Sequence, residues 1–419
     1  MDTLLYKAYL SILSNELKPA MGCTEPIAVA YAGALARQTL GHLPSAVSLC
    51  VSGNIIKNVK SVVVPHTGGR KGLKTAVAAG LVFGDATKEL EVLSCASPSD
   101  LSALDQALSS IPITISTSPS PDPFDIQVTA DEVFVRILHT HTHIAALQKN
   151  GKDLIPPSPE ETSDAPADMK NLLTVDRIVE FADAVDIADV QPVLDTQIRL
   201  NTAISQEGMS GRYGAGIGRI LLRSYGSSVQ NRAKAYAAAG SDARMNGCEM
   251  PVVINSGSGN QGLTASIPVI IYAKEIGASD SDLYRALVVS NLVAIHLKSG
   301  IGTLSAYCGA TSAGAGAGAG ITYLYGGRYH EIAHTIVNTL AINSGMICDG
   351  AKSSCAAKIA SAVEAGLLGM QMSKADSQFY GGDGIVVKGV ENTIHAVSEL
   401  AREGMKETDV EILHLMMQT

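Results

Sequence analysis

The chain has 419 residues, of which 46% are apolar and only 17% are charged, with a net charge of −9 at pH 7. This balance excludes a disordered chain, and the length is enough for a large core and two domains. The acidic charge, the absence of Trp and the 4% aromatic content argue against a nucleic-acid partner.

The N-terminal part predicts helices followed by a small sheet. Apolar residues at helical spacing indicate a helix over Leu4–Leu17. Thr24 is placed as the N-cap of a second helix that ends near Leu40, before Gly41. Segments rich in β-branched residues follow, with one helix between them. The expected strands are Ala46–Ser52, Val59–Val64, Glu89–Ser94, Pro112–Ser116, Ile126–Thr129 and Val133–His139, and the expected helix is Thr75–Phe83.

The C-terminal part predicts helices throughout. Segment 151–170 carries four prolines among acidic residues and is interpreted as a linker. Alternating alanine and glycine over Ala313–Gly320 favour closely packed helices over a flexible tether. The expected helices are Val175–Ala184, Gly216–Leu222, Ser228–Ala239, Ser281–Leu297, His330–Ala341, Ser354–Leu367 and Val390–Arg402.

We therefore predict an α+β protein. Residues 1–150 are expected to form a mixed domain with a small sheet, whose first helices can pack on the second domain. Residues 171–419 are expected to form an all-α domain. No run reaches the ~18 apolar residues of a membrane helix, and the first residues do not resemble a signal peptide. We expect a cytoplasmic protein without a membrane partner, in which the small-residue helices leave room for a homodimer.

The seven cysteines are too few, and odd in number, for a disulfide framework. Cys308, Cys348 and Cys355 each stand beside small or polar residues. On one continuous helix, Cys348 and Cys355 would lie ~10 Å apart along the axis, too far for one small site. With Cys348 in a turn and Cys355 in the first turn of the next helix, both can face one point. Taken alone, the spacing is a weak metal signal and favours three core cysteines.

Cys23 and three histidines are further candidates. Cys23 directly precedes a helix, whose N-terminal dipole would lower the pKa of a thiol, so it is either a reactive thiolate or an inert thiol in a turn. His139, His141 and His143 alternate, so a strand would place all three on one face. That pattern favours a polar edge face over a zinc site, and one of the three could serve as a general base.

Two loops are candidate binding segments. Asn255–Gly262 contains Ser256, Ser258, Asn260 and Gln261 before an apolar helix, a setting that suits a carboxylate or phosphate. The turn Val64–Arg70 contains Thr67 and follows Lys57 and Asn58. It could contact a substrate carboxylate, although a plain turn is the simpler interpretation.

Six segments stand out in order along the chain. They are Met-Gly-Cys-Thr-Glu-Pro (21–26), Ser-Gln-Glu-Gly-Met-Ser-Gly (205–211), Ser-Asp-Ala-Arg-Met (241–245), Asn-Ser-Gly-Ser-Gly-Asn-Gln-Gly (255–262), Leu-Ser-Ala-Tyr-Cys (304–308) and Gly-Met-Ile-Cys-Asp-Gly-Ala-Lys-Ser-Ser-Cys (345–355). Together they resemble the L-cysteine desulfidase family, which is related to the α-chain of the iron–sulfur L-serine dehydratases. The match spans nearly the whole chain, from Cys23 to Cys355.

The resemblance implies conversion of L-cysteine to pyruvate, ammonia and sulfide, with an oxygen-sensitive [4Fe-4S] cluster and no pyridoxal phosphate. It implies that Cys308, Cys348 and Cys355 hold the cluster and that Cys23 has an acid–base role. The serine dehydratases have a longer gap between their last two cluster cysteines, so the short gap here favours the desulfidase branch. We expect the iron without a protein ligand to bind the substrate thiolate.

The resemblance leaves the general base and the residues that bind the substrate carboxylate as hypotheses. Cys23 or His141 would remove the α-proton of the substrate. The loop with Ser256, Ser258, Asn260 and Gln261 would fix the substrate carboxylate, with help from Lys57, Asn58 and Thr67.

Three alternatives remain open. The first is an iron–sulfur L-serine dehydratase, because serine differs from cysteine by one atom. The second is a pyridoxal-phosphate lyase with a lysine such as Lys352 as the Schiff base. The third is a cysteine or sulfide sensor that binds its ligand at a cluster without turnover.

Overall fold

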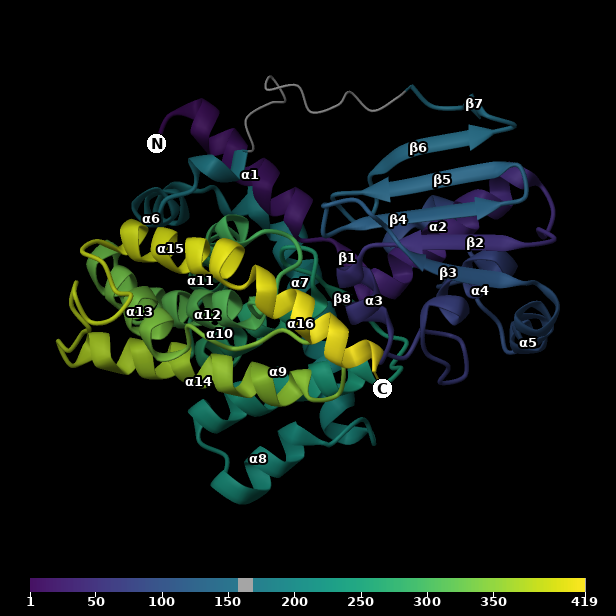
Figure 1. Cartoon of the computed structure of the whole chain (residues 1–419). Coiled ribbons are helices and arrows are strands. Elements are labelled where there is room, and N and C mark those ends of the chain that lie inside the picture. Colours follow the sequence, from purple (N-terminus) through teal and green to yellow (C-terminus); the bar gives the residue numbers. More distant parts are fainter. Residues whose placement is uncertain (157–168, 419) are drawn as a thin grey trace.

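The computed structural model describes residues 1–156 and 169–418. It is an α+β protein in which a single sheet belongs to the N-terminal part and helices make up most of the rest (Figure 1). The predicted linker, 151–170, lies mostly outside the described residues. Among those residues, no helix combines the length and apolarity that crossing a membrane requires.

The N-terminal part is a six-stranded sheet in the order β3-β2-β4-β5-β6-β7. Only the β2–β3 pair is parallel. Alternate residues of β5, such as Val133, Val135 and Ile137, are buried because helix α2 covers that face. The strands are β2 (Val47–Val51), β3 (Ile113–Thr117), β4 (Asp125–Ala130), β5 (Val133–Leu138), β6 (Ile144–Lys149) and β7 (Lys152–Asp153).

The helices that accompany the sheet pack closely. Helix α2 crosses α4 where a Cβ atom on Gly80 would lie 1.9 Å from the carbonyl oxygen of Ala30. Only glycine fits at that crossing. The helices of this part are α2 (Thr24–Leu40), α3 (Gly53–Val59), α4 (Leu73–Phe83) and α5 (Asp100–Ser110).

The helical part is built around α12, whose Ala313–Gly320 segment is buried. A Cβ atom on Gly314 would lie 2.3 Å from the oxygen of Ala362 in α14, and one on Gly316 would lie 2.4 Å from that of Ser290 in α11. This confirms the predicted close packing. The helices are α6 (Val175–Ala184), α7 (Ile187–Ser210), α8 (Ile217–Tyr225), α9 (Val229–Met245), α10 (Gly259–Ile276), α11 (Asp280–Ile301), α12 (Gly309–Leu324), α13 (Tyr329–Ile342), α14 (Cys355–Lys374) and α15 (Val390–Glu399).

Three elements connect the two parts. Helix α1 (Thr3–Glu16) belongs to the hydrophobic core of the helical part, where the rings of Tyr9 and Phe181 lie 5.3 Å apart. Strand β1 (Pro19–Met21) pairs antiparallel with β8 (Pro251–Val253). The C-terminal helix α16 (Lys406–Met417) lies against α3 of the sheet part (Figure 1). The predicted boundary at 151–170 stays a prediction.

Three local predictions are wrong. Val59–Val64 is not a strand: Val59 ends α3, and Val62 and Val64 are buried in the turn that follows. Glu89–Ser94 is not a strand either, because Ala86–Glu91 forms a 3-10 helix. The β-branched and apolar residues at these positions reflect burial, not sheet pairing. The N-cap of α2 is Cys23, one residue before Thr24.

Candidate functional site

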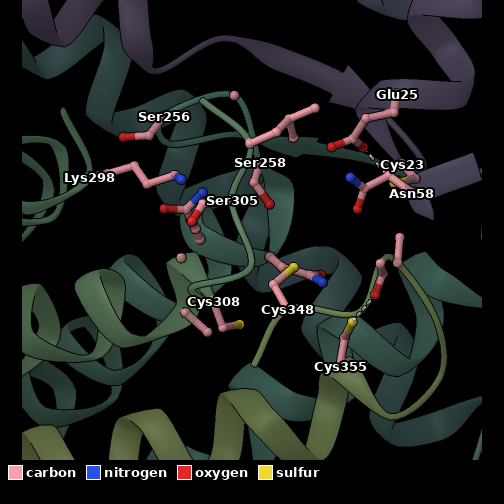
Figure 2. Close-up of a pocket in the computed structure, with 18 of the residues that line it drawn as sticks. Cys23, Glu25, Asn58, Ser256, Ser258, Lys298, Ser305, Cys308, Cys348 and Cys355 are labelled. Atoms are coloured by element: carbon pink, nitrogen blue, oxygen red, sulfur yellow. Dashed lines mark hydrogen bonds between the residues drawn. The ribbon is translucent and has the colours of Figure 1, made fainter. Parts of the chain in front are cut away.

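A cavity lies where the sheet part meets the helical part, and most of the predicted site residues line it (Figure 2). Cys23, Glu25 and Asn58 lie on one side, and the three cysteines of the helical part lie on the other. The predicted residues in its wall are Cys23, Asn58, His141, Ser256, Ser258, Asn260, Gln261, Cys308, Cys348 and Cys355. Residues that were not singled out as site residues are Glu25, Arg244, Lys298, Thr303, Ser305, Tyr307 and Lys358.

Backbone pairing brings two of the cysteines together. Tyr307 and Ile347 form an isolated antiparallel bridge. The flanking N–H groups of Cys308 and Cys348 donate to the carbonyls of Met346 and Ala306, at 3.0 and 2.6 Å. These bonds hold the two thiols side by side although 39 residues separate them in the sequence.

Cys355 reaches the same cavity from the start of α14. It is the first residue of that helix, and Cys348 precedes the helix in a segment that turns at Gly350, which has φ +90°. A side chain at 350 would also collide with the carbonyl of Lys57, at 2.2 Å. The predicted placement of Cys355 in the first helical turn is therefore confirmed, whereas Cys348 lies next to the Tyr307–Ile347 bridge, before the chain turns at Gly350.

The three thiols differ in their tendency to ionise. The pKa of Cys348 is lowered to about 6, first by a hydrogen bond from Cys308 and further by the charges of Lys57 and Lys298 and a backbone N–H. The same bond and burial raise the pKa of Cys308, and burial raises that of Cys355. Of the three thiols, Cys348 therefore has the strongest tendency to ionise.

The cavity is electropositive. Helices α2, α10, α12 and α14 all begin in its wall, at or next to Cys23, Ser258, Cys308 and Cys355. Helix N-termini carry partial positive charge and free N–H groups. Lysine and arginine side chains of the wall add full charges. The site is therefore suited to anionic groups, including thiolates.

Three separate thiols around one electropositive cavity form a donor set of the kind that iron–sulfur clusters use. Among the described residues, no group of three or more His, Cys, Asp or Glu side chains converges closely enough to hold a single metal ion. A cluster has several irons and does not require its ligands to meet at one atom. The donor set thus fits a cluster better than a mononuclear metal.

Cys23 differs from its expected state. Its thiol is buried and donates to Glu25 Oε2 at 3.0 Å. Burial, and then the negative charge of Glu25, raise its pKa well above the ordinary value, despite its position before a helix. The expected lowering of the pKa by the helix dipole is therefore wrong, because desolvation outweighs that dipole.

The three histidines do not share a strand face. Strand β5 ends at Leu138, and residues 139–143 form the connection to β6, with His139 at φ +67°. His139 pairs with Asp122 and its ring stacks on His143 at 6.2 Å. Only His141 is buried and turned into the cavity, so the expected common face is wrong.

His141 is held as a neutral ring. Burial lowers its pKa, and its Nε2 has no hydrogen-bond partner within the described part of the chain. The edge of Phe124 packs against the ring, with centroids 4.7 Å apart. An uncharged imidazole with a free nitrogen in a cavity can accept a proton from a bound molecule.

The loop before α10 is in the wall, as expected for an anion-binding segment. Asn255 and Ser258 close a tight turn, with Ser256 at φ +49° and Gly257 at φ +76°. Thr24 donates to the carbonyl of Gly257 at 2.8 Å and so fixes the loop to α2. Oε1 of Gln261 has no partner in the described structure and is available to a ligand.

Two predicted binding residues do not reach the cavity. Lys57 is buried and pairs with Asp409 of α16. The hydroxyl of Thr67 donates to the carbonyl of Val64 at 2.7 Å and closes the turn 64–70. Asn58 alone of this group lines the cavity.

Lys298 and Arg244 were not singled out individually. Lys298 lies in α11, and burial lowers its pKa to about 8. Arg244 lies in the last turn of α9 and is 1% exposed. A cation among mostly small or apolar neighbours in a helix was the available signal, since such a charge is buried only where it has a partner or a role.

Comparison with known proteins gives one family. The model of the serine dehydratase alpha chain matches residues 87–414. A UPF0597 protein of Desulfitobacterium hafniense is 55% identical over 416 residues, covering 98% of this chain and 97% of its own. UPF0597 proteins of Lachnoclostridium phytofermentans and Finegoldia magna are 49% and 46% identical, over 99% and 98% of this chain and the full length of each relative.

Proposed function

The chain belongs to the serine dehydratase alpha-chain family, and on this premise we propose that it is an L-cysteine desulfidase that releases pyruvate, ammonia and sulfide. The observation that carries the proposal is the meeting of Cys308, Cys348 and Cys355 in one electropositive cavity. Those thiols would hold a [4Fe-4S] cluster. When bound, the cluster would supply a Lewis-acidic iron that polarises the bond to the leaving sulfur.

The residues around the cluster site support acid–base chemistry. His141, neutral and with Nε2 free, would take the α-proton of L-cysteine. The protonated thiol of Cys23, backed by Glu25, is placed to give a proton instead of taking one. Its raised pKa makes Cys23 a poor base at pH 7, which favours His141 in that role.

The remaining wall residues would bind and enclose the substrate. Ser256, Ser258 and Asn260 offer hydroxyl and amide groups at the N-terminus of α10. The ammonium of Lys298 would balance the negative charge of the thiolates, since the charges of Cys348 and Cys308 raise its pKa against the effect of burial. The cavity has a volume of about 100 Å³, and hydroxyl, amide and charged side chains stand in its wall, which suits a short amino acid.

A serine dehydratase is the second candidate, and the name of the matching family favours it. The pyridoxal-phosphate alternative loses support because Lys352 is paired with Asp349 and does not line the cavity. The third alternative is a sensor that binds cysteine or sulfide without turnover. Steady release of pyruvate from L-cysteine would exclude it.

The test is a comparison of kcat/KM for L-cysteine and L-serine, with anaerobic protein and with sulfide and pyruvate measured together. We expect equal yields of sulfide and pyruvate from L-cysteine and at least about tenfold lower kcat/KM for L-serine, a preference of ~1.4 kcal/mol. A preference for L-serine would assign the chain to the dehydratase reaction. Inactivity with both would contradict the proposal.

A further inference from the structure

Arg244 is a buried cation with unused donors. It lies in the last turn of α9 and is 1% exposed, in the wall of the cavity. Its Nη1 donates to Asn260 Oδ1 at 2.9 Å. Its Nε and Nη2 have no hydrogen-bond partner among the described residues.

No ion pair among the described residues includes Arg244. Glu25, an acidic neighbour in the cavity wall, already accepts hydrogen bonds from Cys23 and Thr24. A guanidinium stays charged at any ordinary pH, and burying it unpaired is costly. The site therefore calls for an anionic ligand with two oxygen acceptors.

The two free nitrogens lie on one edge of the guanidinium, which is the edge that binds a carboxylate in two parallel hydrogen bonds. Arg136 of this chain uses the same edge on Asp125, with Nε–Oδ1 at 2.9 Å and Nη2–Oδ2 at 3.2 Å. Gly259 packs against the guanidinium of Arg244. A Cβ atom there would lie 2.3 Å from Nε, so any side chain at position 259 would collide with the guanidinium, and glycine is required for Arg244 to keep this position.

We propose that Arg244 binds the α-carboxylate of the amino-acid substrate through Nε and Nη2, with Asn260 fixing the plane of the guanidinium. The inference rests on the proposed function only in taking the ligand to be an amino acid. Arg244 thus takes the role that was expected of Lys57 and Thr67, because neither of those residues reaches the cavity. The carboxylate would then be held between α9 and the start of α10.

The test uses binding without turnover. L-Alanine keeps the α-carboxylate and amino group but has no leaving group, and L-alaninamide lacks the carboxylate charge. Their affinities are measured by calorimetry for the wild-type protein, R244Q, R244K and R232K. Arg232 pairs with Glu275 outside the cavity wall and serves as the control. Thermal melting checks that each variant is folded.

We expect the wild type and R232K to prefer L-alanine by about 10- to 150-fold, the range for a hydrogen-bonded charge. R244Q should lose this preference, and R244K should keep only part of it because a lysine lacks the fork. A wild type without the preference, or an R244Q that retains it, would overturn the inference. Inactivity toward both L-cysteine and L-serine with the preference intact would instead refute the proposed function alone.

Discussion

At the scale of single residues, burial decides the chemistry of the cavity. Cys23 stands before a helix, yet desolvation and Glu25 keep its thiol protonated. His141 is uncharged for the same reason, because burial disfavours the imidazolium. The sequence identifies both side chains as candidates but carries no information on how deeply each is buried, so it predicts the residues and not their protonation.

His141 should control the acid side of the pH profile. Burial lowers its pKa, Glu25 and Glu16 oppose that shift, and Arg244 adds to it. The ring is therefore unprotonated at neutral pH and becomes charged only below the ordinary range for histidine. We expect kcat/KM to stay level down to about pH 6.5 and to fall as the pH drops through the lowered pKa.

Replacing His141 by Gln should reduce kcat by about 10²- to 10⁴-fold, the usual contribution of a general base, with a small change in KM. Steady-state kinetics across pH 5 to 8 check both expectations. His143, which is not part of the cavity wall, provides the control H143Q. An H141Q variant with unchanged kcat and an unchanged acid limb would remove His141 from the mechanism.

At the scale of elements, the sequence predicts most helices and strands β2 to β5 because their apolar spacing matches their burial. It does not predict β6 or β7, whose residues are only half-buried or exposed. It fails for Val59–Val64 and for residues 139–143, where buried or alternating residues lie in turns. Arg244, Lys298 and the three cysteines come from separate elements. Their meeting depends on the crossing of α9, α11, α12 and α14, which spacing along one segment cannot predict.

The crossing of α12 and α14 should be sensitive to added volume. In Gly314→Ala, the new Cβ would lie 2.3 Å from the carbonyl of Ala362, so the two helices must separate. We expect a loss of about 1–3 kcal/mol in the free energy of unfolding, as for other overpacked sites. Weaker iron retention should accompany it, because these helices carry Cys308 and Cys355.

Gly345→Ala is the matched control for this prediction, because a Cβ atom there meets no atom within 4 Å and φ is not positive. We expect it to change stability by less than about 0.5 kcal/mol. Chemical denaturation measures both variants. Equal stability of Gly314→Ala and Gly345→Ala would show that the crossing tolerates separation.

At the scale of the whole molecule, the C-terminal helix closes the structure onto the sheet part. Lys57 of α3 is 1% exposed and pairs with Asp409 of α16, and Asn54 donates to the same carboxylate at 2.7 Å. The backbone of Lys57 also packs against Gly350, between Cys348 and Cys355. The position of α16 is thus coupled to the cysteine segment through α3.

Asp409→Asn should loosen this contact. It leaves the buried charge of Lys57 without its partner, at a cost of about 1–3 kcal/mol in unfolding free energy. Faster hydrogen exchange in α16 should accompany the loss, whereas Glu407→Gln, on the exposed side of the helix, should change neither. Unchanged exchange in α16 would mean that other contacts hold the helix.

The central claim is that Cys308, Cys348 and Cys355 hold an iron–sulfur cluster. The most direct measurement is the iron and acid-labile sulfide content of protein purified without oxygen, with its visible spectrum, for the wild type and for single Cys→Ala variants. Cys248, which is buried outside the cavity wall, provides the control. We predict about four irons and a brown absorption band for the wild type and Cys248→Ala, and loss of both in the three cavity variants. A wild-type protein that stays colourless and free of iron after anaerobic reconstitution would contradict the claim.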